Sequence, residues 1–494
     1  MLAGLTKPFE DINNAIQAYT TSFSLSTAQV SSSGSVAYAS QFDATDWSGV
    51  ITARQLTFAA DNPDTPDVDE TGTPSSVDVW NTKTTMAAQF AGTNWSTSRR
   101  IATWDPQTRA GVRFISGTGG ITATQLAALD TAYVSGNDSA NYLNYLRGDQ
   151  SNEVGAGTQS YRKRTSLLGD IVNAKVTPVG PPSLPLGDTN NPGYSAFKAA
   201  HSDRKTVVYA GANDGMLHAF DGSTGETTSG HELFAYVPSA LFSGPDNTPQ
   251  VSGLAQLGAP NYLHHFYVDA TPLAFDIDMN FAGGTKTTAA DGDGADWRTV
   301  LIGGLGKGGR SYYALDVTDP AAMTTEATVA SKVLWEFTDT TMGFSFGAPI
   351  VVKTAQYGWV AIFTSGYNAP QGQGYLYIVN PRDGRLLQKI STGISADGLT
   401  QASAYVQDYA NYVADAVYVG DLDGNLWRLG LAATTGNYPT PTGLATLTDG
   451  TPPAVGNPQP ITTAPLIEIS PSTRQRFVLV GTGRLLASSD INSA

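Results

Sequence analysis

Short runs of β-branched and aromatic residues recur along this chain, separated by polar turns that contain glycine. The clearest copy is Val207–Glu226, with the sequence VVYAGANDGMLHAFDGSTGE. An apolar run ends at a glycine, a short polar turn follows, and a second run ends at Asp. This order predicts a β-hairpin, because such runs are typical of strands and glycine permits a tight turn. The second run, Met216–Phe220, is expected to bury one face.

The same pattern returns several times, which predicts a repeat architecture. Further copies begin at positions 299, 359 and 415, a shortened copy begins at Phe477, and a weaker early copy begins at Trp47. The first strands of the copies end at Gly211, Gly303, Gly366, Gly420 and Gly481. We therefore predict an all-β fold, a quinoprotein-like β-propeller of about seven modified blades over roughly residues 40–490. The shortened copy is expected to complete the last blade, since closing the ring removes exposed sheet edges.

Two kinds of interruption set the expected domain boundaries. Residues 1–35 begin with apolar side chains at helical spacing and continue into a Ser/Thr-rich linker. Residues 36–494 form the propeller in this interpretation. Insertions are expected near residues 59–76, 120–165 and 241–265, and the second of these contains two helical patterns.

The charge balance excludes some classes of partner. The chain has 28 Lys and Arg against 43 Asp and Glu, a formal net charge of −15. Nucleic acids and anionic membranes attract basic surfaces, so we expect neither as a partner. The sequence has no cysteine, which excludes disulfides, thiolate catalysis and cysteine-ligated zinc. It also has no apolar run long enough for a membrane-spanning helix, so no membrane insertion is expected.

The repeat cores also resemble a known family when they are taken together and in order. The segments that carry the resemblance are LLGDIVNAKVTPVG, VVYAGANDGMLHAFDGSTGE, LFAYVPSALF, DWRTVLIGGLGKGGRSYYALDVTDP, WEFTDTTMGFSFGAPIVV, FTSGYN, YVGDLDGNLWRL and VLVGTGRLL. In this order they are similar to the C-terminal propeller of the PilY family, the type IV pilus-tip adhesin and assembly proteins. The resemblance covers about residues 40–490.

This resemblance implies a function without catalysis. Family members are exported and sit at the pilus tip or the outer cell surface. There they contact minor pilins, support pilus assembly and the balance of extension and retraction, and attach to host or abiotic surfaces. Their N-terminal adhesive region has no counterpart here, and the first residues do not form a signal peptide. We therefore expect Met1 to be a boundary within a longer exported protein.

The resemblance also implies a calcium loop just before the YVGDL strand, with a pattern of alternating Asp residues and one glycine. At this place the sequence has Gln407–Asp415. Asp415 and Asn411 match oxygen-bearing positions of the pattern, and Asp408 lies one register away. The other positions differ, so an intact calcium loop is not supported. Ca²⁺ at this degenerate loop stays a hypothesis.

A second acidic stretch has the composition of a cation loop. Asp291, Asp293 and Asp296 are separated by small residues that let a loop curl around an ion. Carboxylate oxygens at alternating positions are the ligands that Ca²⁺ uses in proteins. The alternative is a solvated turn, and the sequence favours it.

Two other functions compete with the pilus interpretation. The blades also resemble pyrroloquinoline quinone dehydrogenases, but the vicinal disulfide of many such enzymes cannot form here and the repeated Trp-docking pattern is missing. A carbohydrate-binding propeller is the other alternative. Tyr405, Tyr409 and Tyr412 could form its binding surface, because exposed aromatic rings stack on sugars.

The tripeptide Arg147–Gly148–Asp149 has the sequence that integrins recognise on exposed loops. In the sequence YLRGD, the tripeptide follows directly on a segment with a helical pattern and does not stand in a polar loop. We therefore favour a structural role, in which Arg147 and Asp149 pair with neighbouring groups.

Overall fold

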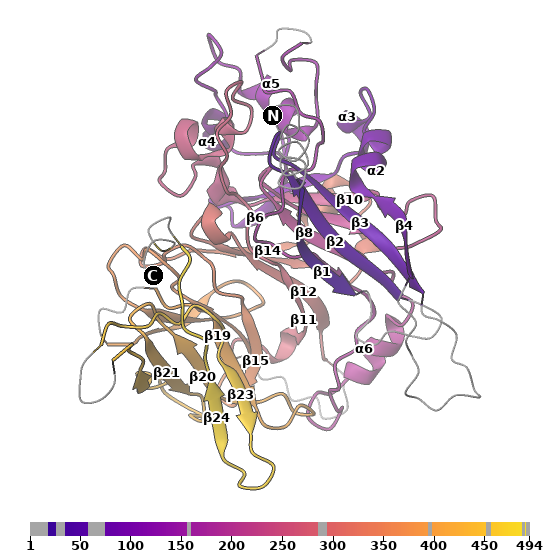
Figure 1. Ribbon diagram of the computed structural model, residues 1–494. Helices are drawn as coiled ribbons and strands as arrows, with labels where there is room; N and C mark the ends of the chain where they lie inside the picture. The colour runs from indigo at the N-terminus through magenta and orange to yellow at the C-terminus, as the bar shows by residue number, and fades with distance from the viewer. Residues whose placement is uncertain are drawn as a thin grey trace, which may run out of the picture. The chain divides into compact units, whose positions relative to one another are not determined.

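The computed structural model describes residues 18–25, 35–57, 75–155, 160–284, 294–393, 398–450, 456–486 and 490. They fall into two compact units (Figure 1). Unit 1 comprises Met1–Pro181, Asp203–Pro272 and Asp319–Val333, and unit 2 comprises Pro182–Ser202, Leu273–Thr318 and Leu334–Ala494. Strands dominate both units, as the sequence predicted. In the described ranges no helix has the length and apolar character needed to cross a bilayer.

Unit 1 is built on two sheets. The first has the order β1-β2-β3-β4, and Figure 1 shows β2, β3 and β4 side by side. The second has the order β6-β5-β10-β9-β8-β7, in which β10 and β5 run parallel. The strands are β1 (Ala18–Leu25), β2 (Ser35–Asp43), β3 (Ser48–Thr57), β4 (Ser75–Asn81), β5 (Ile101–Asp105), β6 (Ala110–Arg113), β7 (Thr177–Val179), β8 (Val207–Ala212), β9 (Met216–Asp221) and β10 (Glu232–Val237).

Short helices pack around the sheets of unit 1. The α-helices are α2 (Thr82–Gln89), α3 (Trp95–Ser98), α4 (Ala123–Ala128), α5 (Ser139–Arg147), α7 (Pro249–Ser252) and α8 (Glu326–Ala330), and the 3₁₀ turns are η1 (Ser239–Phe242), η2 (Leu254–Gln256) and η5 (Pro320–Ala322). The helices α4 and α5 form where the sequence predicted helical segments. Thr122 and Gln125 form a capping box at the start of α4. On α5, the Tyr142 hydroxyl donates to the Leu254 carbonyl at 2.7 Å and fixes the helix to η2.

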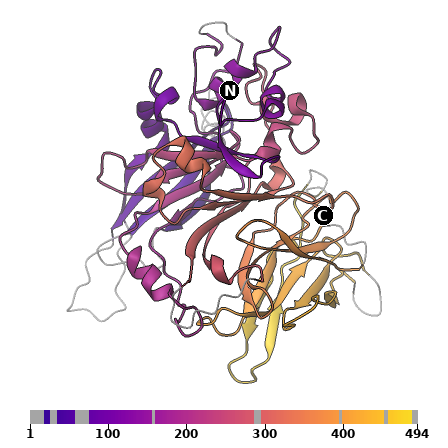
Figure 2. The same cartoon turned by 180° about the vertical axis from the view of Figure 1, so that it is seen from behind.

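Unit 2 consists of sheets whose strands follow one another in chain order, visible from behind in Figure 2. Among the described residues, three sheets have four strands each, the strand number of a propeller blade, and a hairpin of β23 and β24 follows. The strands are β11 (Leu273–Asp278), β12 (Trp297–Gly304), β13 (Tyr312–Asp316), β14 (Val333–Phe337), β15 (Ile350–Thr354), β16 (Gly358–Thr364), β17 (Tyr375–Val379), β18 (Leu386–Ser391), β19 (Ala402–Val406), β20 (Ala414–Gly420), β21 (Asn425–Gly430), β22 (Thr442–Thr446), β23 (Leu466–Ile469) and β24 (Arg476–Leu479). The helical elements are α6 (Tyr194–Ala200), η3 (Met279–Phe281) and η4 (Gly306–Gly308).

The predicted hairpins are present in both units. The repeated pattern forms the antiparallel pairs β8–β9, β12–β13, β16–β17 and β20–β21. The acidic residue that ends the second strand has a structural role. Asp221 accepts a hydrogen bond from the Ser223 amide at 2.9 Å, and Asp316 accepts one from the Thr318 amide at 3.0 Å. Each carboxylate thus closes the turn that follows its strand.

Three local expectations need correction. Residues 18–25 were predicted as part of a helix and linker, but they form β1, which pairs with β2. Strand β9 was predicted to bury one face, yet all six of its residues are buried, because this inner strand is covered on both faces. The shortened copy at Phe477 supplies only β24, which pairs back onto β23, and residues 480–485 form no strand. The blade number stays a prediction.

Candidate functional site

The turn of the opening hairpin positions the most concentrated polar group of unit 1. Between β8 and β9, Gly215 has a φ of +89°, which a residue with a side chain rarely adopts. The turn aims Asp214 at the chain segment that follows α5. There the Gly169 amide donates to the Asp214 carboxylate at 2.8 Å, so the hairpin turn and this segment are joined.

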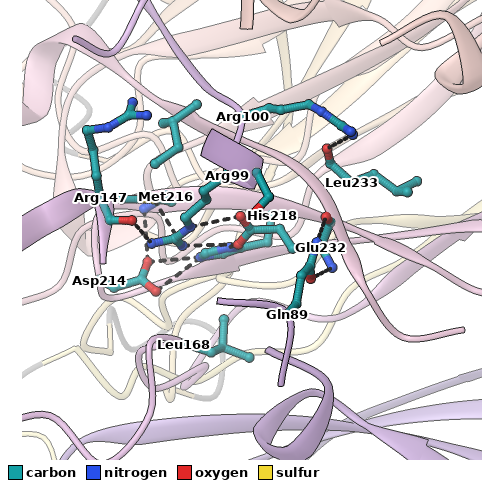
Figure 3. Close-up of polar contacts among 12 residues, drawn as sticks. Gln89, Arg99, Arg100, Arg147, Leu168, Asp214, Met216, His218, Glu232 and Leu233 are labelled. Atoms are coloured by element: carbon teal, nitrogen blue, oxygen red, sulfur yellow. Dashed lines mark hydrogen bonds and ion pairs between the residues drawn. The ribbon is translucent and has the colours of Figure 1, made fainter. Parts of the chain in front are cut away.

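Two carboxylates hold His218, in the middle of β9, from both sides (Figure 3). Its Nδ1 lies 2.9 Å from Glu232, and its Nε2 lies 3.1 Å from both oxygens of Asp214. Burial alone would lower the pKa of His218, but the charge of Asp214 and the hydrogen bonds to both carboxylates raise it to about 9. The imidazole is therefore charged at neutral pH, and both nitrogens donate.

Glu232, at the start of β10, is shared between His218 and Arg99. The Nε and Nη2 of Arg99 donate to the two carboxylate oxygens at 2.9 and 3.0 Å, a bidentate pair. Burial would raise the pKa of Glu232, but the charge of Arg99 and the bonds from Arg99 and His218 lower it to about 2. We call Arg99, Asp214, His218 and Glu232 the β9 charge cluster. Its charges alternate in sign and balance.

The β9 charge cluster holds its protons too firmly for acid–base chemistry at neutral pH. The side chains of His218, Glu232 and Arg99 are almost completely buried, and Asp214 alone among the four reaches solvent, with 18% of its side chain exposed. A histidine that is already protonated cannot accept a proton from a substrate. The geometry therefore supports a role in fixing the β8–β9 hairpin and in shaping the surface next to Asp214.

Asp214 and Met216 border a surface pocket. We call it the hairpin pocket; its wall also includes residues 46–48, at the start of β3, together with residue 162 and residues 164–169. Two guanidinium groups belong to the lining, those of Arg162 and Arg164. Arg164 is engaged by Glu153 at 2.7 Å and by the carbonyls of Tyr145 and Asp149. Charged and aromatic side chains thus line the same pocket of unit 1.

The sequence did not predict the β9 charge cluster or the hairpin pocket. A signal was present, because His218 stands inside an otherwise apolar strand and a buried charged residue needs partners. The partners themselves could not be found, since Arg99 and Glu232 lie 133 positions apart.

The structure does not bring the degenerate calcium loop of unit 2 together around a common point. Asp415 pairs with Arg476 at 2.9 Å. The Asn411 side chain accepts from the Val413 amide at 2.8 Å, and Asp408 accepts from the Ala410 amide at 2.9 Å. Each oxygen-bearing side chain is thus engaged within the protein.

The second acidic stretch lies mostly outside the described residues, which omit Asp291 and Asp293. Asp296 is described and forms an ion pair with Arg298 at 2.8 Å. Across the described ranges, no three Asp, Glu or His side chains form a group suited to a metal ion. The acidic loop near residues 59–76 also lies almost entirely outside the description.

The three predicted surface tyrosines have different environments. Tyr409 is 62% exposed. Tyr412 is half-buried, and its ring lies 5.6 Å from that of Trp359. The Arg476 guanidinium covers the ring of Tyr405 at 3.6 Å. Of the three, Tyr409 is the one that presents its ring to solvent.

The integrin-like tripeptide is structural, as predicted. The Arg147 side chain is buried and donates to the Phe114 carbonyl at 2.8 Å and to Glu326 at 2.6 Å. Gly148 ends α5 with a φ of +125°, and Asp149 accepts from the Ser151 amide at 2.9 Å. A buried arginine cannot be read by a receptor at the surface.

Comparison with known proteins places the chain in a family. Residues 168–494 match the family model described as the PilY1 beta-propeller domain. The type IV pilus biogenesis factor PilY1 homolog of Xylella fastidiosa is 34% identical over 362 residues, which cover 72% of this chain and 26% of that protein. The type IV pilus biogenesis factor PilY1 of Pseudomonas aeruginosa strain PAK is 33% identical over 394 residues, which cover 73% of this chain and 30% of that protein.

A solved structure was also found, the crystal structure of the Pseudomonas aeruginosa PilY1 C-terminal domain. It is 29% identical, covers 63% of this chain and 60% of its own, and has a TM-score of 0.47. The chain spans less than a third of the curated relatives named above. Because the family model covers well over half of the sequence, the chain belongs to the PilY1 family and carries its β-propeller domain.

Proposed function

We propose that this chain is the propeller part of an exported, non-enzymatic pilus protein that acts at the pilus tip or outer cell surface. The observation that carries the proposal is the match of residues 168–494 to the PilY1 beta-propeller domain. Relatives named type IV pilus biogenesis factors support it, because they align with over 70% of the chain. The β9 charge cluster fits a scaffold, since its buried charges are satisfied by one another.

In this proposal the propeller docks minor pilins and thereby supports pilus assembly and retraction. The test is a binding assay between the purified chain and the soluble domain of each minor pilin from the same genome, by biolayer interferometry. We expect saturable binding to at least one minor pilin and none to the major pilin. If a chain that melts cooperatively binds none of the minor pilins, docking through this part of the protein is refuted.

Surface attachment is the second part of the proposal, and Tyr409 is the described residue that supports it. Exposed tyrosines are effective contact residues because a large rigid ring loses little entropy on binding. We expect Tyr409→Ala to reduce adhesion to the target surface without changing the melting temperature. Tyr412→Ala should instead lower the melting temperature, because that ring packs against Trp359. A glycan array distinguishes carbohydrate from abiotic ligands.

Calcium regulation is proposed only in a form that takes account of the ion pair between Asp415 and Arg476 in unit 2. For Asp415 to ligate Ca²⁺ at the loop before β20, it would have to leave Arg476. Calorimetric titration with Ca²⁺, with melting followed in EDTA and in excess Ca²⁺, tests this directly. Binding that is strengthened by Arg476→Gln would support the Asp415 loop. Binding that persists in Asp415→Asn would point to another site, and the absence of binding would remove the calcium proposal.

A further inference from the structure

The hairpin pocket of unit 1 is lined by an arginine, Arg162, two of whose side-chain nitrogens have no hydrogen-bond partner in the part of the chain that the structure describes. The Nε and Nη1 of Arg162 are buried and have no acceptor among the described residues. The central carbon of the guanidinium lies over the ring of Tyr262, 4.0 Å from its centroid. Buried donors without partners cost roughly 1–3 kcal/mol each, so such groups are rare unless something else supplies the acceptor.

The neighbouring arginine of the same pocket shows what a purely structural arginine looks like here. Arg164 also lies over an aromatic ring, that of Tyr145 at 3.8 Å. Unlike Arg162, it donates to the Glu153 carboxylate and to two backbone carbonyls. The two side chains have the same chemistry and a similar stacking partner, but only Arg164 has a carboxylate. A carboxylate would complete Arg162 in the same way as Glu153 completes Arg164.

The pocket wall limits the charge of such a partner. Asp46 and Asp214 both belong to the lining. Asp214 is neutralised by His218, whereas Asp46 accepts hydrogen bonds from the neutral Thr165 hydroxyl and Ser48 amide and feels the charge of Lys83 without forming an ion pair with it. A doubly charged anion such as phosphate would be repelled by Asp46 more strongly than a singly charged one. The wall thus favours a monoanion.

Trp47 supplies an apolar side to the pocket. Its backbone has a φ of +55°, an uncommon conformation for a bulky residue and one that often marks functional sites. The indole is held in place by His264, with ring centroids 3.9 Å apart, and His264 is fixed by Asp170 at 2.8 Å. A flat apolar group can lie against such a wall.

We propose that the hairpin pocket binds a carboxylate attached to a small flat or apolar group, with Arg162 as its charged partner and Trp47 as its apolar wall. The planar guanidinium suits a carboxylate because its N–H groups bind two oxygens side by side. Because Nε and Nη1 are buried, binding in this proposal requires the Arg162 side chain to turn toward the pocket. The carboxylate comes either from a free small molecule or from an acidic side chain or chain end of a protein. The proposal does not rest on pilin docking.

Benzoate is the probe, and calorimetry together with tryptophan fluorescence is the measurement on the full chain. We expect benzoate to bind and to change the tryptophan emission of the chain, and methyl benzoate and inorganic phosphate to bind at least tenfold more weakly. Arg162→Gln should weaken benzoate binding at least tenfold. Lys163→Gln is the matched control, because Lys163 is the adjacent, exposed cation and its loss should change nothing.

Other outcomes have defined meanings. Equal binding of benzoate and its methyl ester, equal binding to the Arg162→Gln protein, or no benzoate binding at all would each overturn the proposal. If Arg162→Gln does not fold, Arg162→Lys keeps the charge but loses the planar fork, and an unchanged affinity in that variant would also overturn it. Peptides with free and amidated C-termini separate the sources: preference for the free acid supports a protein ligand, and benzoate binding without peptide binding supports a small molecule.

Discussion

The properties of single residues in the β9 charge cluster depend on partners that are far away in sequence. Glu232 receives two bonds from Arg99 and one from His218, in a place that water does not reach. A carboxylate buried in this way stays ionised only while its cationic partners, Arg99 and His218, are present. The cluster therefore behaves as one unit, in which removal of one charge leaves others buried and unpaired.

This coupling predicts the effect of removing the Glu232 charge. Glu232→Gln keeps the side-chain volume but leaves Arg99 and His218 facing each other as buried cations. We expect unit 1 to lose about 3–5 kcal/mol of unfolding free energy, measured by urea denaturation. Glu226→Gln is the control, because Glu226 pairs with Lys205 at the exposed surface and its loss should change the unfolding free energy far less. Equal losses in both variants would contradict the account of the cluster.

The pKa of His218 predicts a pH dependence with a definite sign. Its pKa is about 9 in the folded chain and about 6.5 when unfolded, so the folded state binds the proton more tightly. The resulting stabilisation is fully present below about pH 6.5 and is lost as the pH rises through about 9. The melting temperature of the unmodified chain should therefore fall over this range.

The measurement compares the unmodified chain with His218→Gln from pH 6 to 10. The difference in melting temperature should shrink as the pH rises. Using the difference matters, because Lys353 of unit 2 has a pKa lowered to about 8 by burial, and its deprotonation acts with the opposite sign. A difference that stays constant across the range would show that His218 does not carry the charge assigned to it.

At the scale of strands and hairpins, much of the structure could be predicted from the sequence. Apolar runs, turn glycines and the closing Asp are local signals, and they located β8–β9 and β12–β13 correctly. The placement of β1 could not be predicted in this way, because a Ser/Thr-rich segment forms a strand only when a neighbour such as β2 offers its edge. The same limit applies to the hairpin pocket, whose walls come from separate segments of unit 1.

Strand β12 gives a prediction at this scale. Gly303 pairs with Tyr313 of β13, and a Cβ at Gly303 would lie 2.3 Å from the Tyr313 hydroxyl oxygen. Because the tyrosine ring is fully buried, it cannot move aside, and Gly303→Val should destabilise unit 2 by at least about 2–3 kcal/mol. In Gly443→Val the new side chain begins 3.5 Å from Trp427 in an exposed strand, so little change in unfolding free energy is expected. Equal denaturation midpoints for the two variants would contradict this packing argument.

At the scale of the whole molecule, family membership and local chemistry cover different parts of the chain. The family match begins at residue 168, so it includes Asp214, His218 and Glu232. Arg99, Trp47 and Arg162 precede it. The charge cluster and the hairpin pocket therefore join the matched part of the sequence to residues outside it, and the properties of the pocket cannot be transferred from the family description.

The overall charge gives the last prediction. With a formal net charge of −15, the chain repels anionic lipid headgroups, and at low salt this repulsion is screened least. We expect no co-sedimentation with phosphatidylserine-containing vesicles at 20 mM salt in the presence of EDTA, which removes divalent cations that could bridge acidic groups. Neutral vesicles should give the same result, since protein contacts and not lipids hold the chain at the surface in the proposed function. Retention on anionic vesicles under these conditions would reveal a basic face that the charge balance hides, and surface attachment would then have to be sought in lipid binding instead of in contacts such as that of Tyr409.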